Sequence, residues 1–397
     1  MDADTTGYEE ADWLSLVVTS ASVFLVYLVT LSPNVSLGFS GIFSTAAMYG
    51  GVPHPPGYPV AVWWQGLFVH LLPVSNIAWR VAVSSAVAGA LACGLIALLV
   101  SRVGKDLIHR NDSFTQGGCV RIVCGFVAGT GFGFNGAFWG RAVIADVWTL
   151  SICLFCGALC LVLRWCFTPV RTRYLYLSAF VYGLTLTNSQ ILLAAAPAIP
   201  ALLLVAQTRR ILTRWRTVLG CIAALALGLT PYLYVPVASM TNPPMNWGYP
   251  RTVSGFYHVI SRGQYERIQP TSEITAFAKQ VAMYGAVTVK EFGWPFLVVA
   301  SIPWVFFRCT PPPERACLLA SLVLYLCLTL LLIAVLNPTD YLDGRRMIKV
   351  FFSASYVILA VWVGLGLIKV VELCEGRSTP QGDAAGDERR TSGTERG

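Results

Sequence analysis

The stretch "HPPGYP", residues 54–59, combines a titratable imidazole with three prolines. Proline fixes φ and removes a backbone donor, so this stretch cannot continue a helix and predicts a rigid loop. In such a loop His54 could act as a general base or hydrogen-bond a phosphate, and Tyr58 could contact the same ligand. Alternatively, His54 binds a neighbouring backbone carbonyl and only fixes the loop.

Asp146 is a second candidate for acid–base chemistry. It lies in "GRAVIADVWTLS", directly before an apolar run that is long enough to enter a membrane. An ionisable group at that depth is costly, and such groups usually mark functional sites. Two structural alternatives stay open: Asp146 caps the following helix, or it pairs with Arg141, five residues earlier.

Two pairs of residues could bind phosphate: Arg262 with Tyr265 in "SRGQYER", and Arg345 with Arg346 in "DGRR". A guanidinium binds phosphate through two parallel hydrogen bonds, so we expect one pair to bind an anionic headgroup. The alternative is surface pairing with nearby acids, which contributes little stability. These acids are Glu266, Asp340 and Asp343.

Asn246 and Trp247 follow two prolines and predict a tight loop that presents an indole ring. Tryptophan stacks on sugar faces, but it is also common in the aromatic belts of membrane interfaces. The chain has no P-loop, dinucleotide-binding or HExxH motif. The residues therefore predict no metal site and no indispensable cofactor.

The composition indicates what must position these side chains. Of 397 residues, 55% are hydrophobic and 12% are charged, whereas soluble proteins carry roughly 25% charged residues. We therefore predict an all-α polytopic membrane protein. The net charge of +8 falls mainly in short clusters between apolar runs, so it carries topology information and does not predict nucleic-acid binding. The 12 cysteines lie mostly inside apolar runs and are expected to pack between helices.

About ten membrane spans are expected from the apolar runs. Residues 61–73 are too few to cross the membrane, so this segment predicts a re-entrant or interfacial helix. The expected spans are 14–33, 78–100, 119–139, 147–164, 173–188, 190–207, 217–237, 294–307, 316–336 and 349–371.

Arginine and lysine gather in alternate loops, which the positive-inside rule assigns to the cytoplasm. These loops are 101–118, 164–173, 208–216 and 308–315. The chain then divides into a cytoplasmic segment 1–13, a membrane domain 14–371 and a disordered cytoplasmic tail 372–397. The segments 34–77, 238–293 and 337–348 fall on the opposite side, where irregular backbone predicts a shared polar cavity.

Several motifs resemble a membrane family that includes the transmembrane protein O-mannosyltransferase of animals, within the GT-C class. They are "HPPGYP", "AVIADVWTLS", "GLTLTNSQILL", "NPPMNWGYPRTVSGFYHVISRGQY" and "LNPTDYLDGRR". The resemblance implies a GT-C-like helical bundle and an inverting transfer from a polyprenyl-phosphate-linked sugar to a protein hydroxyl or a surface glycan. The last two motifs look most like bacterial members, which implies a bacterial inner membrane with the site facing the periplasm.

One departure from that family affects the chemistry. The family usually reads "DSGE" ahead of the proline motif, and an acid there is the expected general base. Here the matching positions hold Phe39, Ser40, Gly41 and Ile42, and residues 34–77 contain no Asp, Glu, Lys or Arg. The leading hypothesis is therefore a glycosyltransferase-like protein with impaired catalysis.

The main alternative is a non-catalytic protein or subunit that binds a lipid-linked sugar. A secondary transporter would require inverted repeats and ionisable groups at mid-membrane, and the sequence indicates neither.

Overall fold

A computed structural model describes residues 7–105, 116–168, 171–200, 215–264, 269–310, 312–339 and 342–376. Within these ranges every regular element is a helix, and the extended pairing consists of one isolated bridge between Val52 and Asn246. The prediction of an all-α polytopic membrane protein is confirmed.

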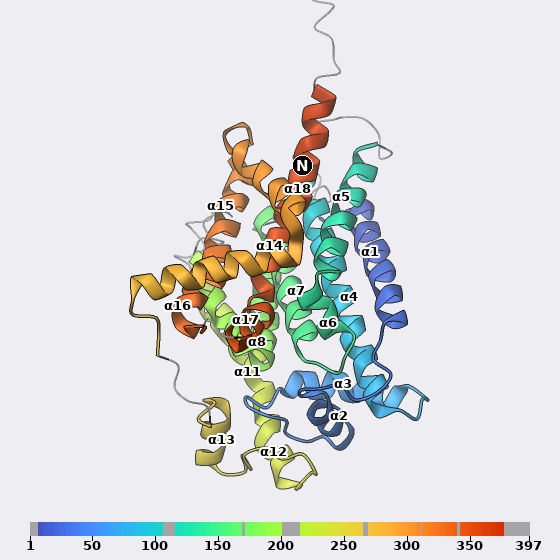
Figure 1. Ribbon diagram of the computed structural model, residues 1–397, viewed down its shortest axis with the longest axis vertical. Coiled ribbons are helices and arrows are strands. Elements are labelled where there is room, and N and C mark those ends of the chain that lie inside the picture. The colour runs from blue at the N-terminus through green and yellow to red at the C-terminus, as the bar shows by residue number, and fades with distance from the viewer. Residues whose placement is uncertain are drawn as a thin grey trace, which may run out of the picture.

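The helices follow one another through the described parts of the chain (Figure 1). The first half contains α1 (Glu10–Val29), α2 (Ser40–Tyr49), α3 (Pro59–Leu71), α4 (Ile77–Gly104), α5 (Gln116–Gly133), α6 (Gly136–Ala142), α7 (Trp148–Phe167), α8 (Arg173–Asn188) and the 3₁₀ helix Gln190–Ala198. The second half contains α11 (Trp215–Leu229), a 3₁₀ turn (Thr230–Leu233), α12 (Tyr234–Met240), α13 (Val253–Ile260), α14 (Ile274–Val305), a 3₁₀ turn (Phe307–Cys309), α15 (Pro312–Leu326), a π-helical turn (Cys327–Leu331), α16 (Leu332–Leu336), α17 (Leu342–Phe351) and α18 (Ser353–Gly376).

Seven helices of the described chain are long and apolar enough to cross a membrane, or eight if the bent pair α5–α6 counts as one span. Seven of these eight coincide with expected spans, whereas the eighth, Ile274–Val305, only contains the expected span 294–307 in its second half. The expected span 173–188 is α8, whose 16 residues fall short of the roughly 20 needed to cross upright. The expected span 190–207 begins as a 3₁₀ helix, and its residues 201–207 lie outside the described residues.

The α4 helix forms the centre of the bundle and is buried along most of its length. Its buried positions are mainly alanine, glycine, serine and valine, and small residues let helix backbones approach closely in a membrane. The neighbouring helices α1, α5 and α7 pack directly against it. Cys93 and Cys156 are buried in this core without a disulfide, as expected for packing residues.

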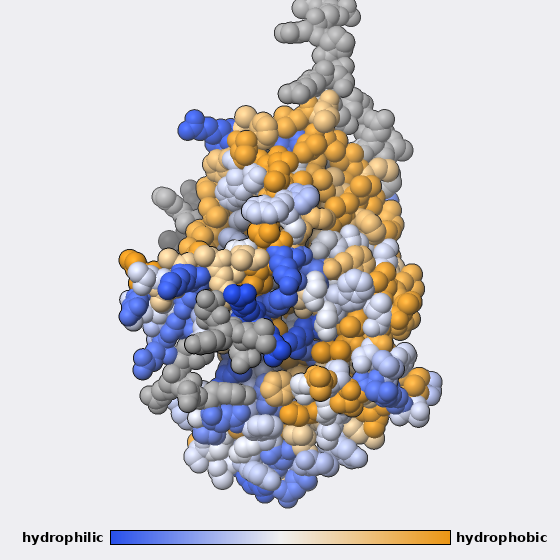
Figure 2. Space-filling model, viewed as in Figure 1, coloured by the Kyte–Doolittle hydropathy of each residue, from blue (hydrophilic) through white to orange (hydrophobic). Residues whose placement is uncertain are grey.

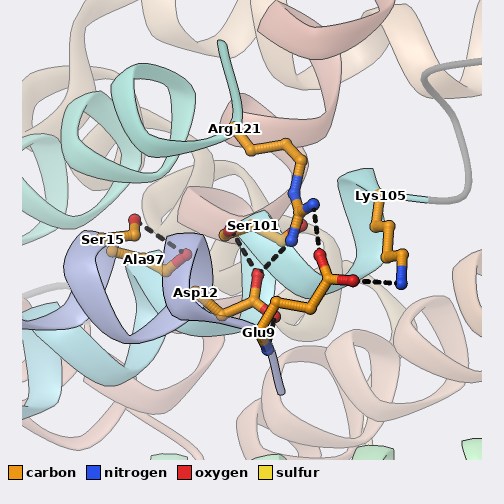
Figure 3. A network of polar contacts seen from close by, with 7 residues as sticks. All are labelled: Glu9, Asp12, Ser15, Ala97, Ser101, Lys105 and Arg121. Atoms are coloured by element: carbon orange, nitrogen blue, oxygen red, sulfur yellow. Dashed lines mark hydrogen bonds and ion pairs between the residues drawn. The ribbon is translucent and has the colours of Figure 1, made fainter. Parts of the chain in front are cut away.

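An ionic network connects helices at one end of the bundle (Figure 3). The Asp12 carboxylate accepts hydrogen bonds of 2.5 Å from both Arg121 and Ser101, and the Glu9 carboxylate pairs with Lys105 and with Arg121. The first helix therefore begins at Glu10, earlier than the predicted boundary at residue 14. Through these contacts Glu9 and Asp12 connect the start of α1 to α4 and α5.

The start of α1 and the last turn of α18 lie at this same end of the bundle (Figure 1). Lys105, which belongs to the first basic loop, and Arg121, which lies just after it on α5, are here as well. This arrangement agrees with the predicted placement of both termini on one side of the membrane. That this side is cytoplasmic stays a prediction. The α18 helix continues to Gly376, beyond the predicted boundary at 371, and residues 377–397 lie outside the described residues.

The opposite end carries α2, α3, α12 and α13 (Figure 1). The expected short helix at 61–73 is present as α3, whereas its re-entrant placement stays a prediction. The first half of α14 runs across the bundle, and the helix then turns at Gly293, which has φ 75° and ψ 155°. The expected separate span at 294–307 is therefore wrong as a unit, because it is the second half of α14.

Candidate functional site

The two most specific motifs of the sequence are hydrogen-bonded to each other. The backbone N–H of Val52, two residues before His54, donates to the carbonyl of Met245 at 2.8 Å, and the N–H of Trp247 donates to the carbonyl of Val52 at 2.9 Å. A Cβ at Gly51 would lie 2.4 Å from the Met245 oxygen, so this approach requires glycine. The proline loop and the loop 242–248 therefore form one unit.

The proline loop is tightly turned, whereas its rigidity stays a prediction. The N–H of Gly57 donates to the His54 carbonyl at 3.0 Å, and the Pro55–Pro56 bond is cis. Gly57 has φ 97°, and a Cβ there would meet a Val235 methyl at 3.0 Å. Tyr58 is buried and takes the left-handed conformation that precedes α3. A non-glycine residue in this conformation stores backbone strain, which is common at binding sites.

His54 is buried inside this loop and is surrounded by aromatic rings. Its ring centroid lies 4.3 Å from that of Phe39, 5.0 Å from Tyr58 and 5.7 Å from Phe43. Its Nδ1 lies 2.9 Å from the Pro55 carbonyl, which is the loop-fixing contact of the structural alternative.

Burial lowers the pKa of His54 to about 4; the hydrogen bond to the Pro55 carbonyl opposes this shift, and the charge of Arg262 adds to it. The imidazole is therefore neutral near pH 7. With Nδ1–H donating to the carbonyl, Nε2 is left as an acceptor. Such a group can accept a hydrogen bond from a hydroxyl, but its pKa makes it a weak general base.

Arg262 approaches the proline loop from the segment that follows α13. Its charge acts on His54 and also on Tyr232, so the three side chains share one electrostatic environment. Arg262 has φ 58° and is a second residue with strained backbone. Its predicted companion Tyr265 lies outside the described residues, as does Glu266.

Asn246 and Trp247 have different surroundings. The indole N–H of Trp247 donates to Gln264 at 2.6 Å, and its ring is partly exposed beside the loop. The amide nitrogen of Asn246 donates to the Ser239 carbonyl at 3.0 Å, while its buried Oδ1 has no hydrogen-bond partner among the described residues. Buried acceptors are usually satisfied, so this oxygen is a candidate ligand contact.

Asp146 lies directly before Val147, the N-cap residue of α7, and combines a contact at the start of that helix with the arginine pair. Its Oδ1 accepts the backbone N–H groups of Val147 at 2.6 Å and Trp148 at 2.9 Å, and its Oδ2 pairs with Arg141 at 3.0 Å. Burial raises the pKa of the Asp146 carboxyl, whereas Arg141 and the two N–H groups lower it. Because donors already occupy both oxygens, the geometry favours a helix cap and an anchor for Arg141.

Phe39, which the resemblance places at the position of a family acid, lies against the proline loop. It precedes α2, 48% of its surface is exposed, and its ring covers the imidazole of His54. Ile42 is half-buried on the first turn of α2. An aromatic ring therefore lies against His54 in the segment where the resemblance to the family leads us to expect carboxylates.

The structure adds an ion pair that the sequence reasoning missed. The Glu291 carboxylate pairs with Lys349 at 2.7 Å and accepts the backbone N–H of Ala137, at the start of α6, also at 2.7 Å. Glu291 lies just before the turn of α14, and Lys349 lies on α17. The sequence signal for this ion pair was weak, since each residue contributes a charge at the edge of an apolar run.

Arg345 and Arg346 are exposed on the same helix, α17. Figure 2 shows hydrophilic residues gathered in the middle of this face, over α17 and the first half of α14. Asp340 and the side chain of Asp343, the proposed partners of these arginines, lie outside the described residues.

The predicted site residues thus fall into two groups. His54, Tyr58, Asn246 and Trp247 belong to the unit of the proline loop and the loop 242–248, and the charge of Arg262 acts on His54 from beside this unit. Asp146 and Arg345 lie around α6 and α17. Ring contact connects the two groups, because Trp148 lies 5.1 Å from Phe351 and packs beside the cluster that contains Tyr58.

A cavity of about 110 Å³ lies elsewhere, between α4, α7, α15 and α18. Apolar side chains such as Leu99, Leu163 and Leu365 line most of it, with Glu314 and Lys369 at its polar edge. It is not the polar cavity predicted between the extracytoplasmic segments.

Residues 40–212, which contain the proline loop and Asp146, match a family described as Protein O-mannosyl-transferase TMEM260 N-terminal domain. The chain is a distant homologue of the TMEM260 proteins. It is 29% identical over 365 residues to Protein O-mannosyl-transferase TMEM260 of Mus musculus, a match that covers 89% of this chain and 49% of the mouse protein.

The corresponding protein of Dictyostelium discoideum is 25% identical over 308 residues, or 72% of this chain and 35% of that protein. The chain thus spans half or less of the relatives it matches. No solved structure matches it. The resemblance to the TMEM260 family is confirmed, whereas these eukaryotic relatives give no support to a bacterial origin.

Proposed function

We propose that the chain binds a polyprenyl-phosphate-linked sugar at the extracytoplasmic end of its bundle and transfers that sugar slowly. The observation that carries this proposal is the joined unit of the proline loop and the loop 242–248, with Arg262 beside it and Phe39 in the place of an acid. The homology to the TMEM260 proteins supports a sugar donor and a protein acceptor.

The transfer step would form a bond between an acceptor hydroxyl oxygen and the anomeric carbon of the sugar. The bond from that carbon to the phosphate oxygen would break, and the lipid phosphate would leave with the electron pair. The hydroxyl proton must go to a base, and a positioned base typically contributes 10²–10⁴-fold. The weak basicity of His54 and the occupied oxygens of Asp146 support slow transfer.

The second candidate is a non-catalytic subunit that binds the donor for an active relative. The loss of both first-loop acids favours it. Both readings predict donor binding, and they differ only in transfer.

The experiment uses the purified full chain in lipid nanodiscs with a labelled polyprenyl-phosphate mannose, the sugar suggested by the relatives' name. Binding is measured by co-purification of label, and transfer by label on an added acceptor protein. Specific binding with slow transfer supports the impaired enzyme, and binding with zero transfer supports the subunit. Absence of binding contradicts both.

A further inference from the structure

Two ion pairs around α6 and α17 share one asymmetry. In the pair Glu291–Lys349 the carboxylate side chain is 4% exposed and the lysine side chain 36%. In the pair Asp146–Arg141 the values are 4% and 39%. In both pairs the acid is buried in the protein and the cation points outward.

Both pairs are attached to the short helix α6. Glu291 accepts the N–H of Ala137 on its first turn, and Arg141 belongs to its last turn. The α17 helix, which carries Lys349, packs against α6, α14 and α18. The two outward cations are therefore held on neighbouring elements, each by a carboxylate that cannot move away into water.

A buried carboxylate orients its partner without using all of that partner's donors. The lysine ammonium has three N–H donors and the guanidinium has five, whereas the contacts to Glu291 and Asp146 engage one nitrogen of each cation. The exposed Arg345 and Arg346 add positive charge on α17. Such an arrangement suits a phosphate, which accepts several charge-assisted hydrogen bonds.

We propose that Lys349 and Arg141 form the phosphate-binding site for the lipid-linked donor, with Glu291 and Asp146 as the positioning residues of the two cations. The ligand class is a phosphate ester carried on a membrane lipid. This inference rests on the proposed function, and it gives roles to two residues, Glu291 and Lys349, that the sequence motifs do not include.

The test compares binding of a fluorescent polyprenyl phosphate with binding of the matching polyprenyl alcohol to the full chain in nanodiscs. Lys349→Met should weaken phosphate-lipid binding roughly tenfold or more, the loss expected for a charge-assisted hydrogen bond. Binding of the alcohol should not change. Lys349→Arg should retain phosphate binding, and the matched control Lys290→Met, an exposed cation on α14, should bind as the wild type does.

A charge swap separates binding from a merely structural role. The double variant Glu291→Lys with Lys349→Glu restores the ion pair but buries the cation and exposes the acid. We expect its thermal stability to exceed that of Lys349→Glu alone but to stay below that of the wild type, because a lysine at position 291 cannot accept the N–H of Ala137; phosphate binding should stay weak. If Lys349→Met alone fails to fold, the neutral pair Glu291→Gln with Lys349→Met replaces it, because it leaves no buried unpaired charge.

Three results would overturn the proposal in distinguishable ways. Wild-type binding by Lys349→Met or by the neutral pair removes this site but leaves the proposed function intact. Full recovery of phosphate binding by the charge swap shows that the pair is structural. A wild type that binds phosphate and alcohol equally contradicts the proposed function itself.

Discussion

Replacing Asp146 by asparagine should destabilise the protein, whatever its effect on transfer. Asparagine keeps one oxygen, which can still accept the N–H groups of Val147 and Trp148 at 2.6 and 2.9 Å. The other oxygen becomes an NH₂ group that faces the guanidinium of Arg141, so a charge-assisted bond of 3.0 Å is lost. Removing such a bond at a buried group costs about 1–3 kcal/mol.

The partial exposure of Arg141 reduces this cost, because water can solvate the released guanidinium. We therefore expect a loss of about 1–2 kcal/mol for Asp146→Asn, and about 1 kcal/mol more for Asp146→Ala, which also removes the helix cap. The assay is thermal unfolding in detergent at one fixed scan rate, since unfolding of large proteins is often irreversible.

The double variant Asp146→Asn with Arg141→Gln provides the matched control. If the two residues act as a pair, its loss of stability should be smaller than the sum of the single losses. The reasoning is refuted if Asp146→Asn keeps the wild-type unfolding temperature and donor binding but lowers transfer by the 10²–10⁴-fold typical of a general base. Asp146 would then be catalytic.

Three further predictions follow from the proline loop. His54 has a folded-state pKa of about 4 against an ordinary value of 6.5, so the unfolded chain binds more protons between these values. Stability should fall as pH decreases below 6.5, by about 2 kcal/mol at about pH 5, and His54→Gln should flatten this dependence of the unfolding temperature. Gly51→Ala should separate the two motif loops and abolish donor binding, because its Cβ would lie 2.4 Å from a backbone oxygen; unchanged binding would show that the bridge is dispensable. Phe39→Asp with Ile42→Glu should raise transfer above the wild-type rate in the labelled-donor assay, and loss of expression or an unchanged rate would contradict the idea that an acid is missing there.

The sequence predicted those parts of the site that local chemistry determines. The interruption of helix at the proline loop follows from three prolines in six residues, and Phe39 lies near that loop because the two are close in the chain. For Asp146 the sequence offered a catalytic role, a helix cap and an arginine pair. The contacts combine the helix cap and the arginine pair, because each of the two carboxylate oxygens accepts a hydrogen bond from a different donor.

Long-range contacts could not be predicted in the same way. The bridge between Val52 and Asn246 joins residues far apart in the chain, and no local pattern indicates such a pairing. The pair Glu291–Lys349 was missed because the run 294–307 was interpreted as a separate span. Because the chain turns at Gly293 inside α14, Glu291 belongs to this helix and not to an external loop.

The most direct test of the central claim measures binding and transfer of the same labelled polyprenyl-phosphate mannose by the wild-type chain in nanodiscs. The account predicts saturable binding that depends on the phosphate, together with transfer far slower in the wild type than in the Phe39→Asp, Ile42→Glu variant. Fast transfer by the wild type would contradict the claim that the missing first-loop acids limit catalysis. Absence of phosphate-dependent binding would contradict the donor site itself.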